Sequence, residues 1–146
     1  MIEKYIINSL QETKELAEKI AEKLKLRGQV ITLNGTLGSG KTYFTSCLIN
    51  YLLKKENLEE TKVVSPTFNI VKEYNLKEIS IFHFDLYRLK NKEELYELDI
   101  ENCFENGISI VEWPEIAEEL IYNISIKINI KILENDKREF CIEYID

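Results

Sequence analysis

Apolar and polar residues alternate along the chain with the periods of both helices and strands. After Ser9, apolar residues recur at helical spacing with Glu and Lys between them, which predicts a helix over about residues 10–26. Residues 29–34 (QVITLN) predict a short buried strand, and residues 41–55 are apolar enough to form a helix that packs on a sheet. The first half of the chain therefore contains a strand–loop–helix unit.

Strand patterns dominate the second half of the chain. Isoleucine alternates strictly with polar residues over 124–132, and residues 140–144 alternate in the same way after a polar segment, 134–137, which predicts a half-buried antiparallel hairpin. The other elements that we expect here are strands beginning at 63–64 and over 68–74, 79–85 and 108–112, a turn at 75–78, and helices over 92–98 and from Pro114 to about residue 121. This order predicts a single domain over residues 1–146 with a mixed α/β sheet.

The loop between the first predicted strand and its helix, residues 35–42, reads GTLGSGKT and matches the phosphate-binding pattern G-x-x-x-x-G-K-[ST]. Glycines let the backbone bend so that its N–H groups surround phosphates. The lysine of the pattern reaches the β- and γ-phosphates, and the hydroxyl that follows it coordinates Mg²⁺. The residues expected to bind the nucleotide here are Gly35, Thr36, Leu37, Gly38, Ser39, Gly40, Lys41, Thr42 and Tyr43.

Such a loop between a strand and a helix predicts an α/β fold of the P-loop NTPase type. We expect a three-layer sandwich whose mixed sheet has parallel core strands and a C-terminal antiparallel hairpin, with helices on both faces. A P-loop protein also needs an acid at the end of a neighbouring strand, to hold Mg²⁺ directly or through water. Two predicted strands end in one, at Asp85 and at Glu112. The pattern leaves open which of them lies at the metal, and either could be an ordinary strand-end acid that faces water.

Other polar residues near these acids have two interpretations each. Ser65 and Thr67 flank Pro66 after a predicted strand, where they form either a switch segment that reads the γ-phosphate or a plain turn. His83 lies between two phenylalanines, so its side chain is expected on the opposite face of its strand, either at the site or as a hydrogen-bonded structural residue. Arg88 could pair with phosphate or with a local carboxylate.

The charge of the chain limits its partners. The 146 residues carry a formal net charge of −7, with 26 acidic and 19 basic side chains. Because nucleic-acid affinity comes largely from Lys and Arg that neutralise phosphates, an acidic chain is not expected to bind nucleic acid tightly by itself, although a local basic patch remains open. The three cysteines are far apart and favour reduced thiols over a disulfide framework or a zinc site. Neither a signal-peptide stretch nor an apolar run of about 18 residues occurs, so we expect a cytoplasmic protein without membrane association.

Four motifs coincide in one order along the chain. They are GTLGSGKT (35–42), SPTF (65–68), HFDLYRL (83–89) and VEWPE (111–115). Together they resemble the TsaE family (formerly YjeE), the ATPases of bacterial tRNA threonylcarbamoyladenosine synthesis. The resemblance runs from the N-terminal helix to the Trp113 region, and the C-terminal hairpin fits in kind. At Thr36 this chain departs from many relatives, which often carry Asp or Glu.

The resemblance implies ATP and Mg²⁺ as ligands and gives roles to the candidate residues. Lys41 matches the family's phosphate residue and is expected to be catalytic, and Thr42 matches a magnesium residue. Glu112 matches the strand-end magnesium carboxylate. Asp85 matches an acid required for activity, which makes it a candidate to orient or activate the attacking water.

The resemblance also implies a switch-like segment and protein partners. Ser65 and Thr67 match that segment, with which we group His83, and Trp113 follows the metal-binding acid as in the family and is expected to help bind the nucleotide. The implied partners are TsaD and TsaB homologues, which carry the tRNA chemistry, so tRNA is reached only through their complex. We expect slow ATP hydrolysis by the chain alone and stimulation by the partners.

Two other function classes stay open. A small-molecule P-loop kinase usually clamps the transferred phosphoryl group with several arginines from a lid, but this chain has only Arg27, Arg88 and Arg138 and no obvious lid insertion. A GTPase-type switch module normally carries an N/T-K-x-D segment, and the nearest match, residues 91–94, reads NKEE.

Overall fold

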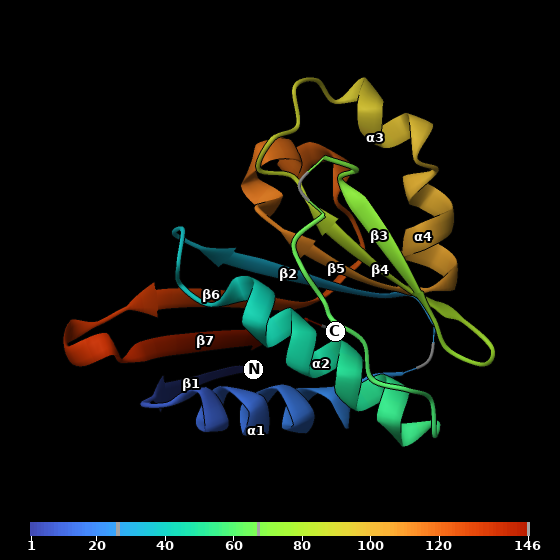
Figure 1. The fold of residues 1–146 in the computed structure, drawn as a ribbon. Coiled ribbons are helices and arrows are strands. Elements are labelled where there is room, and N and C mark those ends of the chain that lie inside the picture. Colours follow the sequence, from blue (N-terminus) through green and yellow to red (C-terminus); the bar gives the residue numbers. More distant parts are fainter. Residues whose placement is uncertain (26, 67, 146) are drawn as a thin grey trace.

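The computed structural model describes residues 1–25, 27–66 and 68–145. Its strands are β1 (Ile2–Ile7), β2 (Gln29–Gly35), β3 (Val71–Asn75), β4 (Ser80–Asp85), β5 (Ile108–Glu112), β6 (Ile124–Ile132) and β7 (Arg138–Tyr144). The described residues build one sheet with the order β1-β7-β6-β2-β5-β4-β3 (Figure 1). Its core strands β4, β5, β2 and β6 are parallel, whereas the pairs β3–β4, β6–β7 and β7–β1 are antiparallel.

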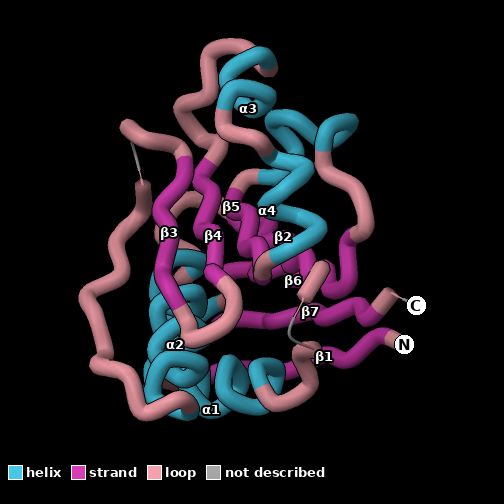
Figure 2. The backbone as a smooth tube through the Cα atoms, turned by 90° about the vertical axis from the view of Figure 1, so that its right-hand side faces the viewer, coloured by secondary structure: helices cyan, strands magenta, loops and turns pink. Residues whose placement is uncertain are grey.

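Helices cover both faces of this sheet. One face carries α1 (Leu10–Ala21) and α2 (Lys41–Lys55), and the other carries α3 (Glu93–Glu97), α4 (Ile100–Asn106) and the 3₁₀ helix η1 (Pro114–Leu120), as Figures 1 and 2 show. A second 3₁₀ turn, η2 (Glu134–Asp136), joins β6 to β7. Among the described residues, no helix has the length and apolar character needed to cross a membrane.

Neighbouring residues of the central strands alternate between the two apolar cores. Ile31 and Ile110 belong to the cluster beneath α1 and α2, whereas Val30 and Val111 belong to the cluster beneath α3, α4 and η1. Every residue of β5 is buried because both faces of this strand are covered. The three-layer arrangement, the parallel core strands and the C-terminal antiparallel hairpin confirm the predicted fold class.

The structure adds two elements that the sequence analysis did not predict. β1 pairs with β7 at one edge of the sheet, and of its six residues only Ile7 is buried, so the strand has no apolar alternation by which to recognise it. The helix α4 buries Ile100, Cys103 and Phe104, at the spacing of one helical face. It is separated from α3 by Asp99, whose φ of 54° interrupts the helical path.

Other predictions were wrong in part. Residues 63 and 64 form no strand, although Val63 is buried. They lie in the segment that leads from the end of α2 toward β3 (Figure 2). The strand expected over 68–74 begins at Val71, the first helix ends at Ala21, and the helix expected from Pro114 is a 3₁₀ helix.

The carboxyl ends of the parallel strands meet beside the amino end of α2. In the register of the sheet, Glu112 of β5 is opposite Leu33 of β2 on one side and Asp85 of β4 on the other. Loops and side chains at this edge are where open α/β sheets bind ligands. The fold therefore places both candidate acids next to the predicted phosphate loop.

Candidate nucleotide-binding site

The phosphate loop connects β2 to α2 in the predicted strand–loop–helix arrangement. Its φ angles are 78° at Gly38 and 109° at Gly40, a region that strains residues with a Cβ. Gly40 is the N-cap of α2 and has no side chain to occupy the first free N–H groups of the helix. The N–H groups and the positive end of the helix dipole at such a helix start suit an anionic ligand.

Lys41 lies inside this loop with its ammonium group close to backbone oxygens. Its Nζ donates to the carbonyls of Gly35 and Thr36 at 2.5 and 3.1 Å, and it lies 4.1 Å from the centre of the Trp113 ring. The side chain is buried, and this burial lowers the pKa of Lys41, while the nearby charges of Glu112 and Asp85 act in the opposite direction. No carboxylate of the described residues forms an ion pair with Lys41, so its charge is available to a phosphate.

Thr42, in the first turn of α2, and Glu112, at the end of β5, are in direct contact beside the phosphate loop. Thr42 Oγ1 donates to Glu112 Oε1 at 3.0 Å and also lies 3.3 Å from Oε2. Glu112 is 2% exposed and also contacts His83, whose Nε2 lies 2.5 Å from Oε2. The structure thus brings the loop hydroxyl to this acid rather than to Asp85.

These residues fit Mg²⁺ held jointly with a nucleotide. The described residues contain no group of three or more His, Cys, Asp or Glu side chains that could bind a metal ion. Mg²⁺ is usually bound by one or two carboxylates together with substrate phosphates, so a buried carboxylate beside a P-loop hydroxyl is a suitable donor set. The buried hydroxyl of Ser39 likewise has no partner among the described residues, although it lies in the middle of the loop.

Asp85 is held by a different set of donors. Ser65 Oγ donates to its Oδ2, and the backbone N–H of Tyr87 donates to its Oδ1 at 3.0 Å. The Tyr87 ring packs on the Trp113 ring with 4.7 Å between their centres. Asp85 therefore has a fixed orientation at the cleft, and Ser65 joins the site through it. Thr67, the other predicted residue of the switch-like segment, lies outside the described residues.

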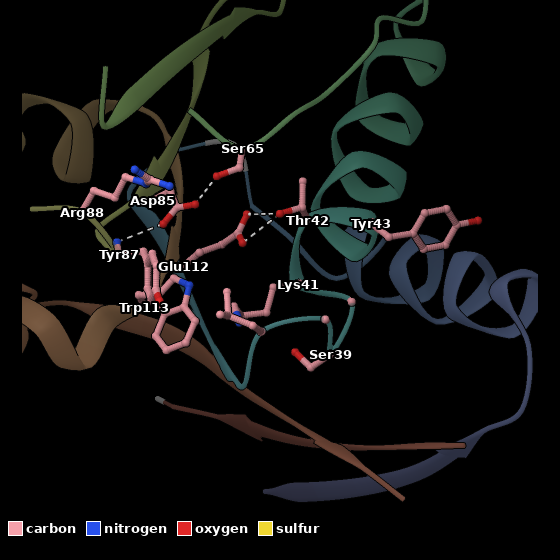
Figure 3. A pocket seen from close by; sticks show the side chains of 13 residues that line it. Ser39, Lys41, Thr42, Tyr43, Ser65, Asp85, Tyr87, Arg88, Glu112 and Trp113 are labelled. Carbon is pink, nitrogen blue, oxygen red and sulfur yellow. Dashed lines mark hydrogen bonds between the residues drawn. The ribbon is translucent and has the colours of Figure 1, made fainter. Parts of the chain in front are cut away.

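The cleft formed by these residues has a volume of about 410 Å³ (Figure 3). Figure 3 shows Thr42, Glu112, Asp85 and Ser65 directed toward one another, whereas the Tyr43 ring is directed away, toward α1. The predicted residues that line the cleft are Leu37, Gly38, Ser39, Gly40, Lys41, Thr42, Tyr43, Ser65, Asp85, Glu112 and Trp113, and Tyr87 and Arg88 line it as well. Gly35 and Thr36 line a neighbouring hollow with Trp113.

His83 does not line the cleft, although it was grouped with the switch-like residues. It lies within β4, fully buried, on the opposite face from Phe82 and Phe84, which pack with the α3 and α4 layer. Its contact with Glu112 places it directly behind that carboxylate. This position in a central strand suits a residue that supports the site rather than a mobile segment.

Arg138 is a site residue that the sequence analysis did not select. It is the first residue of β7, and its Nε and Nη2 donate to the carbonyls of Ser39 and Gly38 at 3.1 and 3.3 Å. The guanidinium group thus holds two carbonyls of the phosphate loop and helps to fix the shape of the loop. No short motif surrounds Arg138, because its partners are about 100 residues away in the sequence.

The family model described as "Threonylcarbamoyl adenosine biosynthesis protein TsaE" matches residues 7–140. The chain belongs to the TsaE family. Proteins named "tRNA threonylcarbamoyladenosine biosynthesis protein TsaE" are similar to it: one from Rickettsia bellii is 41% identical over 91% of this chain and 89% of that protein. One from Bacillus subtilis is 39% identical over 88% and 77%, and one from Aquifex aeolicus is 37% identical over 97% and 96%.

A solved structure supports the assignment of the fold. The crystal structure of Bacillus subtilis YdiB matches with a TM-score of 0.75 and 29% sequence identity, over 100% of this chain and 87% of that chain. The TsaE match covers the phosphate loop, both acids and Arg138, so the whole site lies within the family region.

Proposed function

We propose that this TsaE-family chain is a Mg²⁺-dependent ATPase required for N6-threonylcarbamoyladenosine modification of tRNA, acting with TsaD and TsaB homologues. The observation that carries the enzymatic part is the contact between Thr42 and Glu112, because P-loop enzymes hold Mg²⁺ with these two kinds of side chain. The pathway follows from the family, whose members are named for threonylcarbamoyladenosine biosynthesis.

In this proposal the loop binds ATP through its phosphates. The N–H groups at the start of α2 and the ammonium group of Lys41 would contact the β- and γ-phosphates. Thr42 and Glu112 would hold Mg²⁺, which would supply positive charge to neutralise the phosphates. Trp113, whose ring contacts Lys41 and Tyr87, would form the wall beside the phosphates.

Asp85 is the residue that we assign to the attacking water. It lines the cleft beside Glu112, and both of its oxygens already accept protein hydrogen bonds, so its orientation is fixed before a ligand binds. A carboxylate with a free lone pair in this position would accept a hydrogen bond from the water. The water oxygen would then attack the γ-phosphorus while the bond to the leaving oxygen of ADP breaks.

The features of the site support slow hydrolysis by the chain alone. Arg88 is the arginine that lines the cleft, since Arg138 contacts the loop through its carbonyls. Transition-state charge on the phosphoryl group is commonly stabilised by arginines, and these can be supplied by a partner. We therefore propose that a surface of the TsaD–TsaB complex completes the site, and that tRNA is contacted through that complex.

The alternatives have less support from the geometry. A kinase would need several arginines around the transferred group, and of the described residues one arginine, Arg88, lines the cleft. A GTPase-type switch would need a guanine-reading segment, but in the NKEE segment Lys92 pairs with Glu119 and does not line the cleft.

The experiment is ATP turnover by the chain alone, then with TsaD and TsaB homologues, then with tRNA added, with GTP as competitor. The expected result is slow hydrolysis alone, stimulation by the partners, and little competition by GTP. Rapid hydrolysis that partners do not change, or tight tRNA binding by the chain alone, would contradict the proposal. A phosphorylated metabolite as product would favour the kinase instead.

A further inference from the structure

His83 is a buried polar residue next to a buried carboxylate. Its side chain is fully buried, its Nε2 lies 2.5 Å from Glu112 Oε2, and its Nδ1 has no hydrogen-bond partner among the described residues. A buried imidazole with one unpaired ring nitrogen makes the folded protein less stable than an apolar side chain of similar size would in the same place. The reason for a histidine at this position must therefore lie in its contact with Glu112 Oε2.

The strand register explains why His83 reaches Glu112 from behind. On β4, His83 and Asp85 point to the α2 side, and on β5 Glu112 points to the same side. His83 is opposite Ile110, two residues before Glu112, so its ring extends diagonally under the carboxylate. Thr42 contacts the same carboxylate from the side of the phosphate loop.

The hydrogen-bond pattern defines what the ring contributes. An ionised carboxylate only accepts hydrogen bonds, so the hydrogen of the contact is on Nε2 of His83. A hydrogen on Nδ1 as well would bury a donor without a partner. The ring therefore donates from Nε2 to Glu112 Oε2 and so orients this carboxylate.

We propose that His83 is the positioning residue for the magnesium carboxylate: it holds Glu112 Oε2 so that the carboxylate faces Thr42 and the phosphate loop. This inference rests on the proposed function. Hydrogen-bonding residues behind a metal ligand typically change metal affinity by about 10- to 100-fold when they are removed. His83 should therefore act on metal affinity, and much less on nucleotide binding without metal.

The test uses three variants at this position in the full chain. His83→Gln keeps an N–H donor at nearly the reach of Nε2, and His83→Asn keeps a polar amide that is too short to reach Glu112. His83→Leu removes the donor and keeps similar bulk. Mn²⁺ binding to the protein–ADP complex is measured by electron paramagnetic resonance, and ADP affinity is measured separately in EDTA. Circular dichroism and thermal unfolding check that each variant is folded.

We expect His83→Asn and His83→Leu to bind Mn²⁺ about 10- to 100-fold more weakly than the natural chain, and His83→Gln to stay near it. ADP affinity in EDTA should be similar for all four proteins. Because Gln and Asn are both polar, their comparison remains decisive if His83→Leu does not fold. Equal Mn²⁺ affinity of Asn and Gln variants, or a parallel loss of ADP affinity in EDTA, overturns the inference alone. Failure of the natural chain to bind Mn²⁺ with ADP overturns the proposed function as well.

Discussion

Thr42 and Glu112 are separated by 70 residues in the sequence, and in the fold the hydroxyl of one lies 3.0 Å from the carboxylate of the other. The contact exists because α2 begins at the loop that follows β2, and β5 is paired directly with β2. Since Glu112 is the last residue of β5, its side chain extends beyond the sheet toward the loop. The two acids of the site consequently have different partners and should respond differently to substitution.

Lys41→Ala is expected to abolish productive ATP binding and leave the fold intact. The substitution removes the main cationic contact to the β- and γ-phosphates in a site that partly excludes water. This corresponds to a loss of several kcal/mol of binding free energy. Fluorescent ATP-analogue titration and ATPase assays measure the effect. Lys54→Ala, an exposed lysine near the other end of α2, is the matched control. A folded Lys41→Ala protein with normal activity would refute the phosphate-loop assignment.

Glu112→Ala and Asp85→Ala are expected to have separable effects. Loss of Glu112 should weaken Mg²⁺-dependent ATP binding, because a metal ligand already acts before the reaction begins. Loss of Asp85 should lower turnover by about 10²- to 10⁴-fold with a smaller change in affinity, because a residue that orients water acts in the transition state. Titrations of ATP with and without Mg²⁺, combined with single-turnover rates, distinguish the two. If Asp85→Ala loses Mg²⁺–ATP affinity and Glu112→Ala does not, our assignment of the two acids is reversed.

Arg138→Ala is expected to weaken nucleotide binding although the side chain is directed at loop carbonyls. Two charged hydrogen bonds to Gly38 and Ser39 would be lost, each of about 1.5 kcal/mol or less at this half-exposed position. We expect roughly a tenfold rise in the Kd for ATP, measured by calorimetry. Lys137→Ala, the exposed neighbouring cation, should leave affinity unchanged. The same Kd for both variants would show that the loop holds its shape without Arg138.

Cys103 is expected to resist alkylation in the folded protein. Burial, with added effects from Asp99 and Glu73, raises the pKa of its thiol to about 11, so at pH 8 roughly one thiol in a thousand is ionised. An ordinary thiol with a pKa near 8.5 is ionised to roughly a quarter at this pH. Iodoacetamide labelling followed by peptide mass spectrometry at pH 8 should therefore modify Cys103 in urea but scarcely in buffer. Labelling in buffer should begin only as the pH approaches 11.

Features that depend on short segments could be predicted from the sequence. The phosphate loop is defined by consecutive residues, and the β6–β7 hairpin is defined by the alternation of Ile126, Ile128 and Ile130 with polar neighbours. Both were found where the pattern placed them. β1 was missed because an edge strand that exposes Ile2 and Ile6 has no apolar face to recognise.

Features that depend on pairing between distant segments could not be predicted from the residues alone. Both Asp85 and Glu112 end a strand, and it is the contact of Thr42 with Glu112, and of Ser65 with Asp85, that distinguishes them. The position of His83 behind Glu112 follows from the β4–β5 register, and the contact of Arg138 with the loop follows from the strand order. No local pattern of residues predicts the strand register or the strand order.

The pairing of β1 with β7 has a consequence for how the protein is made. Among the described residues β1 pairs in the sheet with β7, which is synthesised more than 130 residues after it. Arg138, which braces the phosphate loop, arrives with the same late strand. During synthesis β1 therefore stays unpaired, and the phosphate loop lacks its contact with Arg138, until β7 has emerged and folded onto the sheet, so full competence to bind nucleotide should appear only after that point.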